Sequence, residues 1–151
     1  MKNFETFKDF VGELTCNYKR TKLASFSVKS SVDAVSFMKK QYDQILDDHE
    51  EFKVLHLDRK NSVVNIDHHS AGIDSSTLVS VKSIVRNAIL IKTSGIILFH
   101  NHPSGNLKPS NQDIKITRRI KDACELFDIN VLDHIILTRE RHYSFSDNNL
   151  L

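Results

Sequence analysis

The sequence is poor in the residues that cross-link or divide small proteins. It holds two cysteines, two prolines, four glycines and no tryptophan. Cys16 and Cys124 lie far apart and form no CxxC pair, which argues against a disulfide framework or a cysteine-based zinc site and fits a reducing compartment. Both prolines fall within residues 103–109, so no proline-rich linker divides the chain.

Long apolar runs and a charge excess of one sign are also missing. Runs such as Ile96–Phe99 are far shorter than the about 20 residues that a helix needs to cross a bilayer. Residues 1–12 carry charges throughout and lack the apolar core of a signal peptide. We therefore expect a cytoplasmic protein with no membrane partner. Lys and Arg total 21 against 19 Asp and Glu, too balanced to indicate nucleic-acid binding from charge alone.

What remains is a composition suited to one packed domain. The chain has 151 residues, of which 40% are hydrophobic and 26% charged. Segments with apolar residues at helical spacing alternate with short apolar runs typical of strands. We predict an α/β fold, a single-domain mixed β-sheet with flanking helices. The predicted helices cover residues 31–46, 81–92 and 110–127, and the predicted strands cover residues 50–58, 62–66, 96–99, 129–137 and 142–146. Residues 67–79 are interpreted as a polar bend with room for a short strand.

The chemistry of the chain is concentrated directly after the predicted strand 96–99. His100 and His102 are two residues apart, so their side chains share one side of an extended backbone. Pro103 favours that conformation in the residue before it. Asp113 follows eleven residues after His102, in the first turn of the predicted helix, where the helix dipole favours a carboxylate. These three side chains can hold one divalent metal and leave a coordination position open, as catalytic zinc sites do.

Simpler interpretations exist for each part of this pattern. Two histidines in a polar loop can be surface residues, and Ser110 with Asp113 can be a capping pair at the start of a helix. The combination of HxHP after a buried strand with SxxD opening the next helix is more specific than either part. Ser110 can cap the helix and also direct its hydroxyl at a substrate carbonyl oxygen.

The segment HNHPSGNLKPSNQD, residues 100–113, closely resembles the motif of the JAMM (JAB/MPN) metalloproteases, in particular their bacterial RadC-like branch. The resemblance continues in residues 51–55 and 133–137 and weakens toward residue 15. It implies a JAB/MPN-like fold. RadC proteins typically also carry an N-terminal helix-hairpin-helix region, and here we expect only an N-terminal segment, residues 1–28, packed on a RadC-like JAMM domain, residues 29–151.

The resemblance also implies an activity. It indicates Zn²⁺ bound by His100, His102 and Asp113, with water as the fourth ligand, an upstream glutamate as the base and Ser110 stabilising the oxyanion. The expected function is zinc-dependent hydrolysis of a peptide or isopeptide bond in a peptide or protein substrate. The alternative is a non-catalytic metal-binding interaction module linked to DNA repair or maintenance. A nucleobase deaminase is excluded because it requires a P-C-x-x-C pair.

Two glutamates compete for the role of base. Side chains alternate along a strand, so Glu50 shares a face with Phe52 and Val54, whereas Glu51 shares the opposite face with Lys53 and can form an exposed ion pair with it. The family motif places the glutamate two residues before the phenylalanine. Both considerations select Glu50.

Several other residues are not assigned to the site. His134 is interpreted as a hydrogen-bonded core histidine, and the alternative is a group beside the site that orients a metal ligand. His68 and His69 are adjacent and so face opposite sides of a strand, and Asn101 is expected to shape the loop. Cys124 is interpreted as core packing. Partner recognition is expected from residues 67–79 or from the N-terminal segment, while the substrate and the oligomeric state are not predicted.

Overall fold

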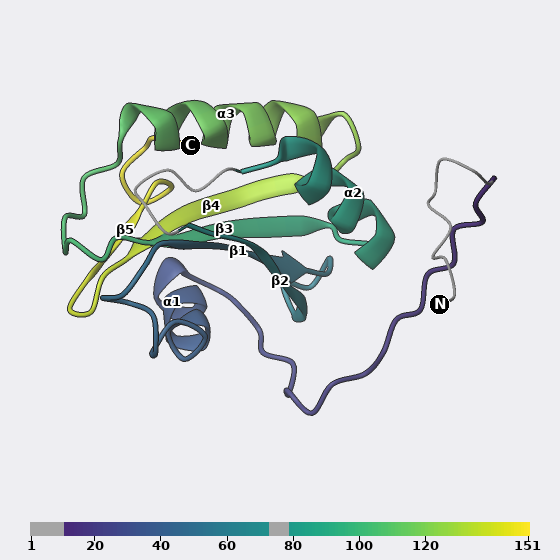
Figure 1. The fold of residues 1–151 in the computed structure, drawn as a ribbon, viewed down its shortest axis with the longest axis horizontal. Helices are drawn as coiled ribbons and strands as arrows, with labels where there is room; N and C mark the ends of the chain where they lie inside the picture. Colours follow the sequence, from purple (N-terminus) through teal and green to yellow (C-terminus); the bar gives the residue numbers. More distant parts are fainter. Residues whose placement is uncertain (1–10, 73–78) are drawn as a thin grey trace, which may run out of the picture.

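A five-stranded mixed sheet forms the centre of the molecule, with helices on both faces (Figure 1). The computed structural model describes residues 11–72 and 79–151. The strands lie in the order β2-β1-β3-β4-β5. They are β1 (Glu51–Leu57), β2 (Val63–Ala71), β3 (Gly95–Asn101), β4 (Asn130–Leu137) and β5 (His142–Ser144). The helices are α1 (Ser31–Lys39), α2 (Val81–Ile91) and α3 (Asn111–Glu125). The predicted α/β fold is confirmed.

The sheet separates the apolar core into two layers, each covered by helices. Helix α1 covers one face of the sheet, where Met38 and Tyr42 pack against Leu55 and Phe99. Helices α2 and α3 cover the other face, which forms a second apolar cluster. Because β3 lies in the middle of the sheet with both faces covered, every one of its residues is buried. That position explains the uninterrupted apolar run from which the strand was predicted.

The connections bring three segments together at one end of the sheet. Strand β3 runs parallel to β4 and antiparallel to β1, and α3 forms the crossover between β3 and β4. The carboxyl end of β3 therefore lies beside the beginning of β1, where Phe52 pairs with His100, and close to the beginning of α3. This is the end of the sheet that carries the predicted metal ligands.

The first helix is shorter than predicted. Helix α1 ends at Lys39, and residues 40–48 continue as successive turns rather than as a helix to residue 46. Tyr42 and Leu46 are nevertheless buried at helical spacing, which is why the sequence pattern extended so far. The backbone carbonyls of Ile45 and Leu46 accept hydrogen bonds from the Asn101 side chain at 3.2 Å. These bonds attach the turns to the end of β3, while within the turns the Gln41 and Tyr42 amides donate to carbonyls three residues before them.

The second strand is longer than predicted. Strand β2 pairs with β1 as far as Ala71, although its second half is polar. It is an edge strand with one neighbour, so it is less buried than the central strands and tolerates polar residues. Residues 73–78, part of the bend predicted at 67–79, lie outside the described residues.

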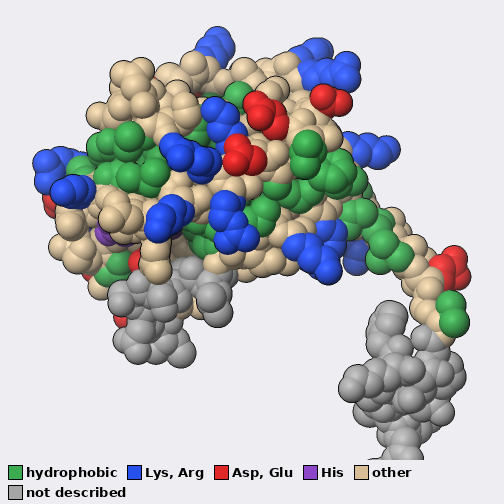
Figure 2. All heavy atoms as spheres, turned by 90° about the horizontal axis from the view of Figure 1, so that it is seen from above, with side chains coloured by type: hydrophobic (Ala, Val, Ile, Leu, Met, Phe, Trp, Pro, Cys, Tyr) green, Lys and Arg blue, Asp and Glu red, His purple; other side chains and the backbone are tan. Residues whose placement is uncertain are grey.

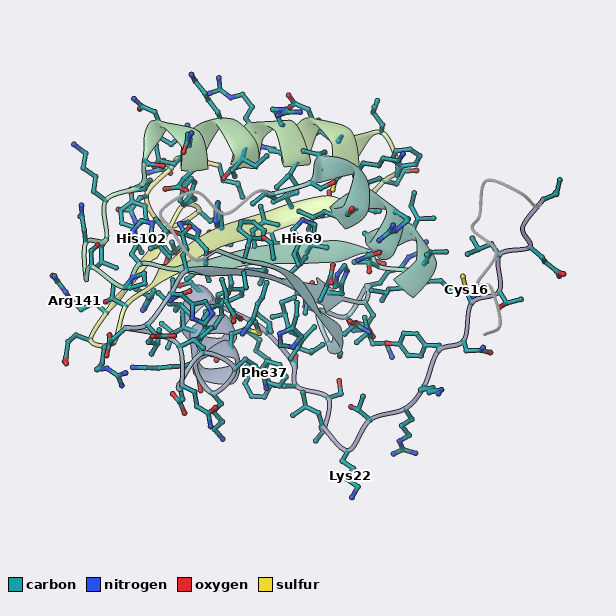
Figure 3. All side chains as sticks on the ribbon, in the orientation of Figure 1. Cys16, Lys22, Phe37, His69, His102 and Arg141 are labelled. Atoms are coloured by element: carbon teal, nitrogen blue, oxygen red, sulfur yellow. The ribbon has the colours of Figure 1, made fainter. Side chains whose placement is uncertain are left out.

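The described part of the N-terminal segment contacts the domain along β2. Residues 11–27 are exposed, and Cys16 and Lys22 lie on a stretch that extends away from the sheet (Figures 1 and 3). Contacts begin with the Tyr18 hydroxyl, which donates to the carbonyl of Val64, and continue with Ser25, whose hydroxyl donates to the carbonyl of Val63 at 2.9 Å. The Phe26 ring stacks on Phe37 at a centroid distance of 5.6 Å, and the Phe26 carbonyl accepts from the Val63 amide at 2.8 Å. Residues 1–10 lie outside the described residues.

The surface over α2 and α3 mixes basic and apolar side chains (Figure 2). A groove of about 570 Å³ between the two helices is lined by Val85 and Ile89 of α2 and by Leu126 and Phe127 after α3. It lies apart from the carboxyl end of β3. Among the described residues, no helix is long and apolar enough to span a membrane.

Candidate metal centre

Strand β3 carries the two histidines to the edge of the core. His100 is the penultimate residue of β3 and is 1% exposed, while His102 directly follows the strand and is partly buried. The chain then reverses, with the Gly105 amide donating to the His102 carbonyl at 3.0 Å. Gly105 has a φ of 77°, which glycine adopts without strain. This turn leads to the beginning of α3.

The three predicted ligands converge on one point. One ligand atom from each of His100, His102 and Asp113 lies within 4.8 Å of the others. Asp113 arrives from the first turn of α3, which begins on the same side of the sheet end (Figure 3). The sequence spacing thus predicted a real spatial cluster.

The separations fit a tetrahedral zinc ion. The two histidine Nε2 atoms are 2.9 Å apart, His100 Nε2 is 3.4 Å from Asp113 Oδ1, and His102 Nε2 is 3.8 Å from Asp113 Oδ2. Zinc bonds of about 2.0–2.1 Å place neighbouring ligand atoms of a tetrahedron about 3.3 Å apart. Two imidazoles and a carboxylate are also a ligand set that zinc accepts.

The second nitrogen of each histidine is already engaged. Nδ1 of His102 lies 2.6 Å from the carbonyl oxygen of Asn106, to which it can only donate, so the lone pair of a neutral ring is at Nε2. Nδ1 of His100 lies 2.7 Å from Nε2 of His134. Both rings therefore direct Nε2 at the point where the Asp113 carboxylate arrives.

A capping box orients Asp113. The Ser110 hydroxyl oxygen accepts from the Asp113 amide at 3.0 Å, and the Ser110 amide donates to Asp113 Oδ2 at 2.7 Å. Burial alone would raise the pKa of Asp113, but the hydrogen bond and charge of His100, together with the Ser110 bonds, hold it well below its ordinary value. Asp113 is consequently a carboxylate at neutral pH and can serve as a ligand. The capping interpretation of Ser110 is confirmed.

Glu50 lies beside this cluster, directly before β1. Burial raises the pKa of Glu50 above its ordinary value, the charges of His100 and His102 lower it, and the charge of Asp113 raises it further. The net direction is upward. Glu50 is thus partly buried, and its pKa depends on the charges of His100, His102 and Asp113.

Comparison with known proteins places this arrangement in a family. The model of the RadC-like JAB domain matches residues 28–150. The chain belongs to the RadC-like JAB domain family. A UPF0758 protein from Flavobacterium johnsoniae is 39% identical over 123 residues, which are 82% of this chain and 53% of that protein. Another from Aquifex aeolicus is 33% identical over 139 residues, 92% of this chain and 58% of that protein.

A third relative gives the same picture. The UPF0758 protein YfjY from Escherichia coli strain K12 is 40% identical over 102 residues, 68% of this chain and 64% of that protein. This RadC-like chain thus spans roughly half to two thirds of the length of the curated relatives it matches. The names of these relatives state no activity.

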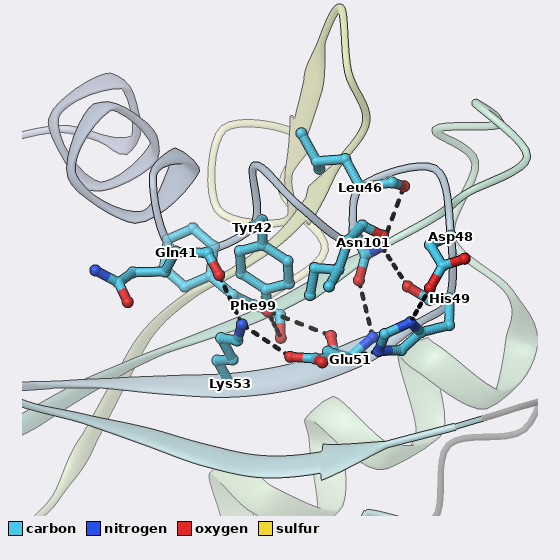
Figure 4. Close-up of polar contacts among 10 residues, drawn as sticks. Gln41, Tyr42, Leu46, Asp48, His49, Glu51, Lys53, Phe99 and Asn101 are labelled. Atoms are coloured by element: carbon cyan, nitrogen blue, oxygen red, sulfur yellow. Dashed lines mark hydrogen bonds and ion pairs between the residues drawn. The ribbon is translucent and has the colours of Figure 1, made fainter.

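Glu51 serves the structure of the RadC-like domain. Its carboxylate lies 2.8 Å from the Lys53 ammonium and 2.8 Å from Nε2 of His49 (Figure 4). The predicted partner is right, but the pair is not exposed, because the Lys53 side chain is 3% exposed, lies over the Tyr42 ring and donates to the Gln41 carbonyl at 2.7 Å. These contacts hold Glu51 on the face away from the metal residues.

Asn101 stands between the two histidines and points to the opposite face. Its side-chain oxygen accepts from the Glu51 amide at 2.8 Å, and its nitrogen donates to the His49 carbonyl at 2.8 Å (Figure 4). The same nitrogen reaches the carbonyls of Ile45 and Leu46. Asn101 thereby ties the end of β3 to the turns that lead to Glu50. Asn101 was expected to shape the loop that follows it. Its side-chain bonds instead join the end of β3 to residues 45–51.

Two residues at the site escaped the sequence analysis. His134 is the buried, hydrogen-bonded histidine that the sequence favoured, but its partners are His100 and Thr117, which corresponds to the alternative role beside the site. Thr117 carried no signal other than being a polar residue on the buried side of α3. A histidine within an apolar strand needs hydrogen-bond partners, and that requirement is the signal that could have drawn attention to His134.

His68, His69 and Cys124 behave as expected. His69 accepts from the Ser80 amide at 3.0 Å, whereas His68 borders the surface that faces the N-terminal segment, so the two do not share a site. His56 is buried and bonded to Thr93 at 2.9 Å. Cys124 is fully buried in the apolar layer beneath α3.

Proposed function

We propose that this chain is a zinc-dependent hydrolase of peptide or isopeptide bonds, in which His100, His102 and Asp113 bind the metal and Glu50 acts as the base. The observation that carries the proposal is the convergence of three ligand atoms within 4.8 Å beside a partly buried glutamate. Membership of a JAB-domain family is compatible with such an activity.

Three protein ligands leave one coordination position of a tetrahedral zinc ion open for water or substrate. A zinc ion bound there would supply Lewis acidity and lower the pKa of a coordinated water toward about 7. Asp113 contributes negative charge, while the two neutral imidazoles contribute none, so the site retains a net positive charge when loaded. That charge favours attack on a carbonyl carbon.

Glu50 is suited to move the proton. Burial raises its pKa toward the range in which a carboxylate can take a proton from the attacking water and return it to the leaving amine nitrogen. Glu51 cannot replace it, because its carboxylate is held by Lys53 and His49. The two neighbouring glutamates therefore have separate tasks.

In the proposed reaction, Ser110 stabilises the oxyanion of the substrate. Its oxygen accepts from the Asp113 amide, which leaves the hydroxyl hydrogen free to donate to an oxyanion on the substrate. This contribution adds to its capping role. Substitution by alanine would therefore affect both the start of α3 and catalysis, whereas threonine retains both functions.

The proposal is tested with the purified chain, a peptide library and a matched pair of variants. We expect zinc-dependent cleavage in the wild type, loss of cleavage with retained zinc in Glu50→Gln, and activity close to the wild type in Glu51→Gln. A chain that binds zinc through His100 but cleaves no peptide or isopeptide substrate would instead be a metal-binding interaction module. Loss of activity only in Glu51→Gln would show that the assignment is displaced by one residue.

A further inference from the structure

His134 lies fully buried on β4, next to the strand that carries His100. Its Nε2 is 2.7 Å from Nδ1 of His100, and its Nδ1 is 2.5 Å from Oγ1 of Thr117 on α3. Phe52 contacts the ring edge-on at a centroid distance of 5.6 Å, and Phe145 stacks on it at 4.6 Å. The ring is therefore fixed in place, and both of its nitrogens have partners.

His100, His134, Thr117 and the Asp113 carbonyl form a row of hydrogen bonds. The donors and acceptors in this row can be assigned from one end to the other. The Thr117 hydroxyl donates to the backbone carbonyl of Asp113 at 2.5 Å, so its oxygen is left to accept from Nδ1–H of His134. A ring buried among phenylalanines is neutral, and with its proton on Nδ1 it presents a lone pair at Nε2. That lone pair accepts from Nδ1–H of His100. The lone pair of His100 is then at Nε2, which faces Asp113.

His100 needs such a partner more than His102 does. His102 lies in a loop and donates to a backbone carbonyl, that of Asn106. His100 lies within the sheet, paired with Phe52 on one side and Ile136 on the other, so the neighbouring backbone carbonyls are used by the strands. Within residues 11–72 and 79–151, the hydrogen-bond partner of its Nδ1 is the side chain of His134.

We propose that His134 and Thr117 are positioning residues that hold His100 in the Nδ1–H tautomer, with Nε2 free to bind zinc. The inference rests on the proposed function, since it assigns a task toward the same metal. The row starts at one ligand, His100, and ends at the backbone of another, Asp113. It thereby fixes the relative position of a ligand from β3 and a ligand from α3.

The first test measures zinc affinity in variants of the row. Thr117→Val removes the hydroxyl with little change of shape, and His134→Leu removes both ring nitrogens. We expect the zinc dissociation constant, measured by competition with a chelator, to rise about 10- to 100-fold in both. Thr117→Ser, which keeps the hydroxyl, is expected to bind zinc as tightly as the wild type.

The chain offers a matched control pair. His56 and Thr93 form the same type of buried contact, a ring Nδ1 to a threonine hydroxyl at 2.9 Å, away from the metal residues. Thr93→Val and His56→Leu are expected to lower stability without changing the zinc dissociation constant. An equal loss of zinc affinity in this control pair would show a general effect of destabilisation and would overturn the inference.

The second test needs no variant. Nitrogen-15 NMR of the imidazoles in the wild-type chain is expected to find His134 neutral with its proton on Nδ1. A proton on Nε2 of His134, or unchanged zinc affinity in both Thr117→Val and His134→Leu, would overturn the inference. A wild-type chain that binds no zinc at His100 would refute the proposed function as well, so the two failures are distinguishable.

Discussion

The Nε2 atoms of His100 and His102 lie 2.9 Å apart, although Nδ1 of each ring is bonded elsewhere. Two neutral rings held in this way direct lone pairs toward each other. Such an arrangement is repulsive unless a metal ion lies between them or one ring carries a proton there, and the Asp113 carboxylate adds negative charge at the same place. A metal-dependent function depends on this relationship more than on any other.

Zinc should therefore stabilise the folded chain. A ligand that binds only the folded state adds about 2.7 kcal/mol to the free energy of unfolding when its free concentration is 100 times the Kd. We expect thermal unfolding with and without zinc to show a rise in Tm for the wild type and none for Asp113→Asn. Asp122→Asn, at an exposed position on α3, is the matched control and should respond like the wild type. A zinc response that persists in Asp113→Asn would contradict the assignment of this ligand.

The Asn101 side chain should contribute to the free energy of unfolding. Asn101→Ala leaves the Glu51 amide and the His49 carbonyl without their partner in a buried region. Unsatisfied buried groups cost about 1–3 kcal/mol each, so we expect the free energy of unfolding in urea to fall by about 2–4 kcal/mol. Asn130→Ala, at an exposed position of β4, should change it by less than about 0.5 kcal/mol. Equal effects of the two substitutions would refute the role of Asn101 in holding the end of β3 to the turns before β1.

His56 should make the chain sensitive to acid. Burial lowers the pKa of His56 from 6.5 to about 4, and its Nε2 has no partner in the described part of the chain. As the pH falls below 6.5, the unfolded chain takes up a proton that the folded chain does not accept until about pH 4. The contribution is about 3 kcal/mol, present at neutral pH and lost between pH 6.5 and 4.

The measurement compares urea unfolding at pH 7 and pH 4.5. The decrease should be smaller in His56→Leu than in the wild type, whereas His68→Gln, an exposed histidine of β2, should leave it unchanged. If His56→Leu and the wild type lose the same free energy on acidification, the origin of the acid sensitivity lies elsewhere.

The two cysteines should differ in reactivity. Burial raises the pKa of the Cys124 thiol to about 11, and Cys124 is inaccessible, while Cys16 is exposed. Because the thiolate is the nucleophile, an alkylating reagent at pH 8 should modify Cys16 at least tenfold faster than Cys124. Peptide mass spectrometry after timed labelling gives both rates. Rapid modification of Cys124 in the folded chain would contradict its burial beneath α3.

The sequence was most informative where one physical requirement dominates. The run at residues 96–99 predicted a central strand because a strand covered on both faces has no polar side. The spacing of His100, His102 and Asp113 predicted a cluster because a strand end and a helix start lie on either side of a short loop. The first helix was predicted too long because residues 40–48 form turns with bonds mostly between residues three apart, which keep Tyr42 and Leu46 buried without a regular helix. The second strand was predicted too short because β2 is an edge strand that tolerates polar residues.

The partners of the metal residues were harder to predict. The contact between His134 and His100 depends on β4 lying beside β3, which is decided by the crossover through α3 and not by local pattern. Thr117 acts through the same packing. The choice of Glu50 over Glu51 rested on strand alternation and on the family motif, and the contacts of Glu51 with Lys53 and His49 agree with it. Glu50 and Ser110 remain predictions as catalytic residues.

Anomalous diffraction at the zinc edge, from crystals of the chain grown with zinc, tests the central claim most directly. We predict one peak per chain, within about 2.2 Å of Nε2 of His100, Nε2 of His102 and a carboxylate oxygen of Asp113. No peak at this position, or zinc bound only at other residues, would contradict the claim.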